Sequence, residues 1–433
     1  MPLKQLREKL KASSSLSPTF GTLLSVTPTL LVGEGLNPSV GDVVEIHNSL
    51  GDKSLGIVTS SHNSSFSITP FSFVEGHKSG DKVYLNKSGL QIPVGKDLLG
   101  RVVNPLGEPL DGLPPYTPSS YTPIIKAPTS AMQRGIINEV FSVGVKSIDG
   151  LLTAGKGQKL GIFAGSGVGK STLMGMIVRG AKAQIKVIAL IGERGREVPE
   201  FIHKNLKGDL SDTILVVATS DDSPLMRKYG AFSAMAIAEY FQDEGYDVLF
   251  MMDSLTRFAM AQREIGLALG EPPTTKGYPP STLTLLPQLM ERAGKKEGKG
   301  AITAFFTVLV EGDDLSDPIA DQSRSILDGH IVLSREMTDF GIYPPINIIN
   351  SASRVSGEIT DTEQKKASQK FRRLYSMLKE NEVLIRIGAY QAGSDPELDE
   401  AIGRKEWVED FLKQDEQELW EFETTKTKLL EIL

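Results

Sequence analysis

Residues 164–171, with the sequence AGSGVGKS, constrain the fold of this chain more than any other feature. They match the P-loop pattern GxxxxGK[ST] apart from alanine at the first position, and they join an apolar strand pattern to a helical one. Small residues let backbone N–H groups wrap a phosphate chain, and the following helix presents the positive end of its dipole. The segment predicts a nucleotide site in which the phosphates contact Gly165, Ser166, Gly167, Val168, Gly169, Lys170, Ser171 and Thr172.

Two side chains of this segment have defined expected roles. Lys170 reaches the β- and γ-phosphates, and the Ser171 hydroxyl is a ligand of Mg²⁺, so ATP and Mg²⁺ are the expected substrate and cofactor. Alanine lacks glycine's easy access to positive φ, so we expect that Ala164 is not left-handed.

Length and composition set outer limits. The 433 residues suggest two or three domains, and a formal net charge of -7 gives no overall basic field for nucleic acid or anionic lipid. No cysteine is present, so disulfides and cysteine-based zinc sites are excluded. The N-terminus has no apolar signal core, and the apolar run 301–310 is too short to span a bilayer, so a cytoplasmic location is expected.

The hydrophobic pattern changes three times along the chain. Leu3, Leu6 and Leu10 fall on one face of a short helical pattern, and short β-rich runs separated by turn signals then suggest a small barrel. Apolar strands next alternate with helices, as in a mostly parallel sheet covered on both faces, and the charged remainder is helical over 361–380, 397–413 and 415–432. We therefore expect an α/β protein with an amphipathic segment over 1–18, a β-barrel domain over 19–92, an ATPase domain over 93–358 and a helical domain over 359–433.

Four residues outside the P-loop are candidates for the chemistry. Asp253 ends an apolar strand pattern, where a Walker-B carboxylate holds the magnesium shell, although a helix cap gives the same pattern. Glu193 also follows a strand, as a carboxylate that polarises water or as part of a charged turn. Arg354 is a surface arginine or one supplied to a neighbouring subunit's γ-phosphate, and Tyr343 stacks on adenine or is buried.

Six blocks, in order, then identify a family resemblance. They are GRVVNPLG from Gly100, GIFAGSGVGKSTL from Gly161, GERGREVPEF from Gly192, DSLTRFAMA from Asp253, REIGLALGEPPTTKGYPPSTLTL from Arg263 and GIYPPINIINSASRV from Gly341. From about Thr19 to its end, the chain resembles the ATPases of type III protein export, especially the flagellar ones, which are relatives of the catalytic subunits of rotary ATP synthases.

The resemblance implies roles that the residues alone left open. Glu193 would be the catalytic carboxylate, ordered by Arg194 and Glu197, and Glu197 is also a possible metal neighbour. Asp253 would be the Walker-B aspartate, and Arg354 would act in a neighbouring subunit's site. The adenine pocket would include Tyr343 and, from the helical domain, Tyr390.

The resemblance also implies an architecture and partners. It predicts a RecA-like core between an N-terminal β-barrel and a C-terminal helical domain, assembled as a homohexamer. Its partners would be a stator-like regulatory protein at the N-terminal segment, a central-stalk-like protein, an export gate and complexes of chaperones with export substrates. The protein would be cytoplasmic and peripheral at the inner face of the cytoplasmic membrane.

The expected function is Mg-ATP hydrolysis that energises type III export, most of all of flagellar components. A virulence injectisome ATPase is the first alternative, followed by a rotary ATP synthase-type subunit and a ring-shaped RNA translocase. The net charge and the absence of an evident aromatic and basic stacking face in the barrel weigh against a nucleic-acid partner.

Overall fold

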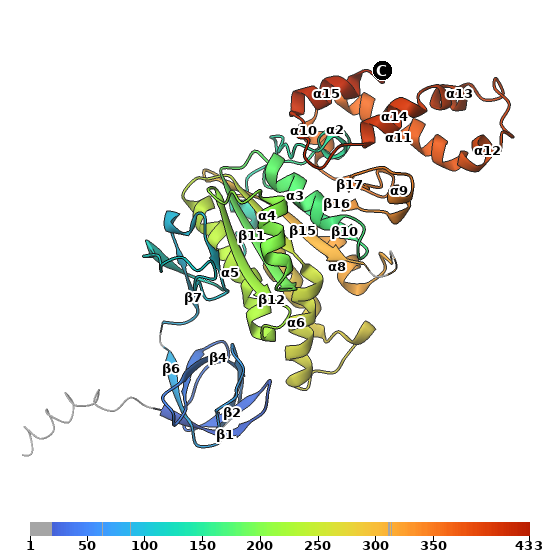
Figure 1. Ribbon diagram of the computed structural model, residues 1–433. Helices are drawn as coiled ribbons and strands as arrows, with labels where there is room; N and C mark the ends of the chain where they lie inside the picture. The colour runs from blue at the N-terminus through green and yellow to red at the C-terminus, as the bar shows by residue number, and fades with distance from the viewer. Residues whose placement is uncertain (1–19, 63, 87, 311, 313) are drawn as a thin grey trace, which may run out of the picture.

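The computed structural model describes residues 20–62, 64–86, 88–310, 312 and 314–433. They form a β-barrel, a central α/β unit and a C-terminal group of helices, in that order along the chain (Figure 1). This is the fold class predicted from the sequence. The amphipathic segment predicted over residues 1–18 lies outside the described residues.

The barrel consists of six antiparallel strands that close in the order β1-β2-β5-β4-β3-β6. Its interior is filled by the inward-facing apolar residues of these strands, among them Leu31, Phe66 and Val83, which are almost completely buried. The strands are β1 (Phe20–Val26), β2 (Leu31–Glu34), β3 (Val43–His47), β4 (Lys53–His62), β5 (Ser65–Pro70) and β6 (Lys82–Asn86). The even spacing of short strands in the sequence therefore corresponds to a small barrel, as expected.

A short stretch of chain connects the barrel to the central unit. Strand β7 (Gln91–Val94) pairs antiparallel with β9 (Ser120–Pro123), and β8 (Val102–Val103) joins the edge of the central sheet beside β12. Apart from β9, the proline-rich segment between residues 104 and 128 contains no helix or strand. The side chains of Ile92 and Val94 are buried in the same hydrophobic cluster as the central sheet.

The central sheet has the strand order β17-β16-β10-β15-β13-β11-β12-β8, and β14 pairs with β15 beside this path. All pairs are parallel except those of β17 with β16 and of β14 with β15. The strands are β10 (Lys159–Ala164), β11 (Ile185–Glu193), β12 (Thr213–Thr219), β13 (Val248–Asp253), β14 (Gly294–Lys295), β15 (Ala301–Leu309), β16 (Gly329–Val332) and β17 (Ala352–Ser353). Because β10, β11 and β13 run in one direction, their carboxyl ends meet at one edge of the sheet.

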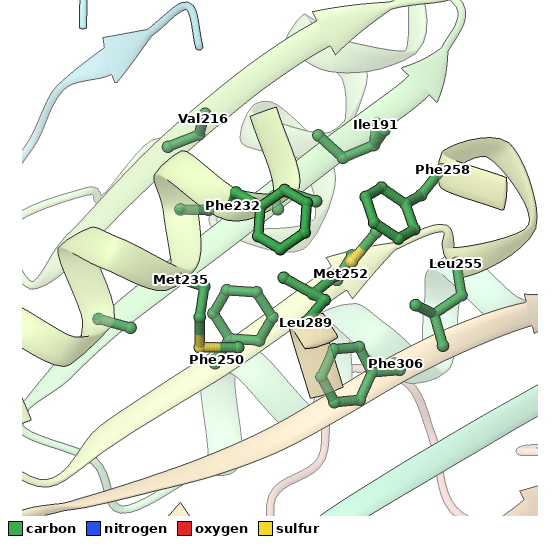
Figure 2. Packing of buried hydrophobic residues seen from close by; sticks show 14 of the residues in the cluster. Ile191, Val216, Phe232, Met235, Phe250, Met252, Leu255, Phe258, Leu289 and Phe306 are labelled. Carbon is green, nitrogen blue, oxygen red and sulfur yellow. The ribbon is translucent and has the colours of Figure 1, made fainter. Parts of the chain in front are cut away.

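Helices cover both faces of this sheet. One cluster packs α5 to α7 against it and contains the aromatic layer of Figure 2, where Phe232 contacts Phe258 with 5.6 Å between ring centroids and Phe250 lies 5.7 Å from Phe306. The helices of the unit are α2 (Lys146–Leu151), α3 (Lys170–Gly180), α4 (Glu197–Asn205), α5 (Pro224–Asp243), α6 (Leu255–Ala268), α7 (Pro280–Met290), α8 (Pro318–Ile326), α9 (Arg335–Asp339) and α10 (Ser356–Ile359), with short 3-10 turns η1 (Lys96–Leu98), η2 (Ala131–Gln133) and η3 (Thr275–Gly277). Because the central sheet is buried on both faces by closely packed side chains, the ends of its strands are held in fixed positions.

One ion pair is buried inside the central unit. The guanidinium of Arg292 forms two hydrogen bonds of 2.7 and 2.8 Å with the carboxylate of Glu239 and donates a third to the Ile124 carbonyl oxygen. Arg292 is only 1% exposed, so its charge depends on these partners.

The C-terminal helices are α11 (Thr362–Glu380), α12 (Glu382–Arg386), α13 (Pro396–Gly403), α14 (Lys405–Leu412) and α15 (Phe422–Leu430). The helical pattern over 397–413 is divided at Arg404, and the helix expected over 415–432 starts only at Phe422. Residues 413–421 instead form a loop, because Gln414 and Trp420 donate to the carbonyl oxygen of Gly144. None of the helices in the described part of the chain is both long and apolar enough to cross a membrane.

Candidate active site

The P-loop occupies the carboxyl end of strand β10. Ala164 is the last residue of the strand and is not left-handed, whereas Gly167 and Gly169 have φ angles of 76° and 101°. Helix α3 begins directly afterwards at Lys170. The two left-handed glycines let the chain turn back on itself between strand and helix, which is the geometry that a phosphate cradle needs.

Lys170 lies between two carboxylates from neighbouring strands. Its ammonium group forms an ion pair with Asp253 at the end of β13, and its Nζ is 3.8 Å from Oε1 of Glu193 at the end of β11. The structure therefore brings together three residues that are spread over more than eighty positions of sequence. Burial opposes the charge of Lys170, but Asp253 and Glu193 outweigh it and raise the lysine pKa.

The protonation of Glu193 is strongly affected by this surrounding. Its burial and then the neighbouring charge of Asp253 raise its pKa to about 7, and Lys170 only partly offsets these effects. Glu193 is thus poised to exchange a proton near neutral pH, unlike an ordinary surface glutamate.

Asp253 is held in place by a further hydrogen bond. The Thr307 hydroxyl on β15 donates to Oδ1 of Asp253 over 2.6 Å, and Asp253 is only 5% exposed. One side of the carboxylate is therefore fixed by the sheet, and its position next to Lys170 is well defined.

A cleft of about 630 Å³ opens in front of these groups. The cleft runs between α3 and α4. Ser171, Glu193 and Asp253 line its inner end, at the phosphate cradle, and Arg179, Glu416 and Gln417 line its outer end. The cleft therefore connects the phosphate cradle with the loop 413–421 that precedes α15.

Of two other predicted residues, Glu197 lines this cleft and Arg194 does not. The Arg194 guanidinium lies 3.8 Å from the Glu197 carboxylate. The Arg194 side chain is 70% exposed and does not line the cleft. The expected role of Arg194 in the site is therefore limited, in this conformation, to a contact with Glu197.

Arg354 lies far from the cleft of its own chain. Its backbone N–H donates to the Asp328 carbonyl oxygen, and the Asp328 carboxylate accepts from the N–H of Lys159, the first residue of β10. Ala164 begins the P-loop at the other end of the same strand, about 17 Å away at the usual rise of a parallel strand. The exposed Arg354 side chain is thus at the opposite end of β10 from the phosphates that its own chain would bind.

The two predicted adenine contacts differ in their positions. Tyr343 is 53% exposed on the segment that passes the P-loop, where a Cβ added at Gly169 would be 3.6 Å from Pro345. Tyr390 is not brought to the cleft, because its hydroxyl is bonded to Asp395 and Asp399 in the helical domain. Neither tyrosine lines the cleft.

Three residues that the sequence interpretation did not single out also belong to this region. Thr307 orients Asp253, Arg335 donates to the Ser166 carbonyl oxygen over 3.1 Å, and the side chain of Arg257 packs against Gly192, with a buried Nε that has no partner among the described residues. Arg257 lies within the block DSLTRFAMA that carries the family resemblance, so the sequence offered a signal for it. Thr307 and Arg335 carried no such local signal.

A parallel sheet with a P-loop after one strand and carboxylates at the ends of two neighbouring strands defines a RecA-like P-loop ATPase. Comparison with known proteins identifies the family. Residues 144–353 match the nucleotide-binding domain of the ATP synthase alpha/beta family, and residues 360–431 match the C-terminal domain of the type III secretion ATPase EscN.

Individual relatives cover almost the whole chain. The flagellum-specific ATP synthase of Helicobacter pylori is 66% identical over 433 residues, which is 100% of both chains. The assembled EscN of enteropathogenic E. coli is 42% identical with a TM-score of 0.91, and EscN in complex with its central stalk EscO is 41% identical with a TM-score of 0.88; each alignment covers 95% of this chain and 99% of the other. The chain therefore belongs to the ATP synthase alpha/beta family, in the branch of the type III export ATPases, and the resemblance seen in the sequence is confirmed.

Proposed function

We propose that this ATPase hydrolyses Mg-ATP in the cleft described above to energise the type III export of flagellar components. The observation that carries the proposal for the site is the position of Lys170, whose ammonium group lies between Asp253 and Glu193. A triphosphate in the P-loop would supply the negative charge that Lys170 now finds in these carboxylates. Lys170 would then bind the β- and γ-phosphates and leave both carboxylates free for their roles.

The residues at the inner end of the cleft fit Mg²⁺. The Ser171 hydroxyl, the Asp253 carboxylate and the nearby Glu197 carboxylate offer only oxygen atoms, which Mg²⁺ prefers. In the described part of the chain there is no cluster of three or more His, Asp or Glu residues that would form a complete metal cage. This agrees with a Mg²⁺ ion that is held by one or two protein oxygens, water and the phosphates of its nucleotide. When bound, the ion would neutralise charge on the phosphates.

Glu193 is the proposed catalytic carboxylate. A group with a pKa of about 7 accepts a proton from water more readily than an ordinary glutamate at the same pH. Its place at the end of β11, beside the lysine that would hold the γ-phosphate, supports a role in orienting the attacking water. Glu197, with Arg194 beside it, would order the approach to this carboxylate.

The site is proposed to be completed by a neighbouring subunit in a homohexamer. Arg354 is exposed and lies at the opposite end of β10 from its own P-loop, which supports its use in another subunit's site. There its guanidinium would stabilise the charge that develops on the γ-phosphate. The assembled state of EscN and its complex with a central stalk support a ring and a stalk-like partner for this chain.

The flagellar assignment rests on the higher identity to a flagellum-specific relative, 66% against 42% for EscN. We extend to this chain a cytoplasmic location at the inner face of the membrane, a stator-like partner at the N-terminal segment, and contacts with the export gate and with chaperones that carry export substrates. Tyr343, beside the P-loop, remains the proposed stacking partner of adenine.

One set of strains and purified proteins tests both the ATPase site and the role in flagellar export. Deletion of the gene should remove flagellar filaments and motility, and the wild-type gene should restore both, whereas Lys170→Ala should not. The purified Lys170→Ala protein, shown to be folded by circular dichroism, should have no measurable ATPase activity. Normal activity in that variant would exclude the site, and normal filaments in the deletion strain would exclude flagellar export.

A further inference from the structure

The loop 413–421 that forms the outer end of the cleft is fixed by one buried side chain. We call residues 413–421 the wall loop. Gln414 is only 6% exposed, and its Oε1 accepts from the N–H of Lys146 over 2.8 Å. Its Nε2 donates to the carbonyl oxygens of Gly144 and Glu418 over 2.8 and 2.9 Å. The amide is therefore satisfied at both ends, and it joins the wall loop to the chain before α2.

The same residue also connects the wall loop to the segment that carries Tyr343. The backbone N–H of Gln414 donates to the Tyr343 carbonyl oxygen over 2.7 Å. Two residues further on, Glu416 and Gln417 line the cleft, whereas Gln414 itself does not. Gln414 thus acts on the cleft only through the residues that it positions.

A second contact ties the wall loop to the P-loop helix. The guanidinium of Arg179, in the last turn of α3, donates to the carbonyl oxygens of Asn205 and Glu416. Arg179 stands nine residues after Lys170, which is about 13 Å along a helix. The wall loop therefore lies about 13 Å from the phosphate cradle along α3, and it adjoins the segment of Tyr343, the proposed stacking partner of adenine.

We propose that Gln414 is a positioning residue for nucleotide binding, which fixes the wall loop so that Glu416 and Gln417 close the outer cleft around the nucleoside. This inference rests on the proposed use of the cleft for ATP. It predicts different effects on the binding of two kinds of ligand, because the phosphates would contact the P-loop and the nucleoside would contact the wall loop. Loss of Gln414 should weaken the binding of a whole nucleotide and leave the binding of a bare phosphate chain unchanged.

The test compares two ligands on the full-length protein at one protein concentration with Mg²⁺ present. Isothermal titration calorimetry measures the affinity for a non-hydrolysable ATP analogue and for inorganic tripolyphosphate. Gln414→Ala should weaken the binding of the analogue about tenfold and that of tripolyphosphate less than twofold. In steady-state assays, the KM for ATP should rise about tenfold, with kcat within about twofold of the wild type, as expected for the loss of a ground-state contact.

Gln364 provides a matched control. It is also a buried glutamine between the helical domain and the α2 region, only 2% exposed, with Nε2 directed to the Asp149 and Gly150 carbonyl oxygens and to the Thr153 hydroxyl. It does not line the cleft, and its side-chain hydrogen bonds go to none of residues 413–421. Gln364→Ala should therefore lose a similar amount of stability and keep the wild-type ratio of the two affinities.

Each outcome has a defined meaning. The proposal is wrong if Gln414→Ala binds the analogue like the wild type, if both ligands weaken equally, or if Gln364→Ala shifts the ratio as much. Should Gln414→Ala not fold, Gln414→Glu keeps the size of the side chain, but its carboxylate cannot donate to the Gly144 and Glu418 carbonyl oxygens, and it should show the same asymmetry. A wild-type protein that binds neither ligand would instead contradict the proposed function itself.

Discussion

The raised pKa of Glu193 implies that this carboxylate destabilises the nucleotide-free protein at alkaline pH. In the folded protein its pKa is about 7, against an ordinary value of 4.5. Below pH 4.5 the group is protonated in both the folded and unfolded states and costs nothing. As the pH rises from 4.5 to 7, the unfolded state loses this proton more readily than the folded state does. The free energy of unfolding therefore falls, and the loss is complete once the pH has passed the folded-state pKa of about 7.

The size of this effect follows from the shift. A difference of 2.5 pKa units corresponds to about 3 kcal/mol above pH 7, and about 2 kcal/mol of this appears between pH 5.5 and 8. The Glu193 side chain is 19% exposed to a solvent-filled cleft, so we halve the second figure to about 1 kcal/mol. For a domain of this size, that is about 2–4 °C in the midpoint of thermal unfolding.

The substitution Glu193→Gln should remove this cost while it keeps the size of the side chain. Differential scanning calorimetry of the nucleotide-free protein should show that the variant gains about 2–4 °C over the wild type between pH 5.5 and pH 8. The variant should still bind Mg-ATP and hydrolyse very little of it. Glu200→Gln is the control, because Glu200 lines the same cleft but is exposed and paired with Lys204, and it should give no alkaline gain. The reasoning is refuted if the difference in midpoint between Glu193→Gln and the wild type is the same at both pH values.

Three further predictions concern the assembly, the site and the core. Arg354→Ala mixed with Lys170→Ala should regain part of the ATPase activity that each lacks alone, and no recovery in verified mixed rings would contradict action across subunits. Thr307→Val should lower kcat about tenfold, with ATP binding retained, since it removes the hydrogen bond that orients Asp253; an unchanged kcat would show that this bond is dispensable. Arg292→Ala should lower the free energy of unfolding by about 3–5 kcal/mol, because it leaves the Glu239 carboxylate buried without its partner. Urea unfolding measures this loss, and a much smaller value would contradict the prediction.

The parts of the site that follow from local patterns were predictable from the sequence. The P-loop is one continuous segment between a strand and a helix, and Glu193 and Asp253 each follow an apolar strand. Because parallel strands end at one edge, these residues had to lie near one another once the sheet was predicted. The local pattern left the roles of Glu193 and Asp253 open, since a carboxylate after a strand can also cap a helix or stand in a charged turn. The structure adds that Lys170, at the start of α3, forms ion pairs with both carboxylates, which end β11 and β13.

The proposed role of Arg354 could not be predicted from a local pattern. Its surroundings within one chain are those of an exposed arginine near the start of β10, so neither its pattern nor its own contacts point to phosphate chemistry. A residue that acts in a neighbouring subunit has its partner outside the chain, and only a family resemblance or an assembly can identify it. Tyr390 was also suggested only by the resemblance, and its adenine contact stays a prediction; within this chain its hydroxyl is bonded to Asp395 and Asp399.

The wall loop was mispredicted because its conformation depends on contacts that are distant in sequence. The segment DEQE after Gln414 is acidic and compatible with a helix, and its local pattern continues into α15. The Gly144 carbonyl oxygen, some 270 residues away, accepts hydrogen bonds from both the Gln414 side chain and the Trp420 backbone, and Lys146 lies 4.6 Å from the Trp420 ring. These interactions hold residues 413–421 in a loop, so the two turns of helix that the local pattern predicts do not form. Since that loop places Glu416 and Gln417 on the cleft, the failure of the helical pattern here marks the residues through which the helical domain contributes to the nucleotide site.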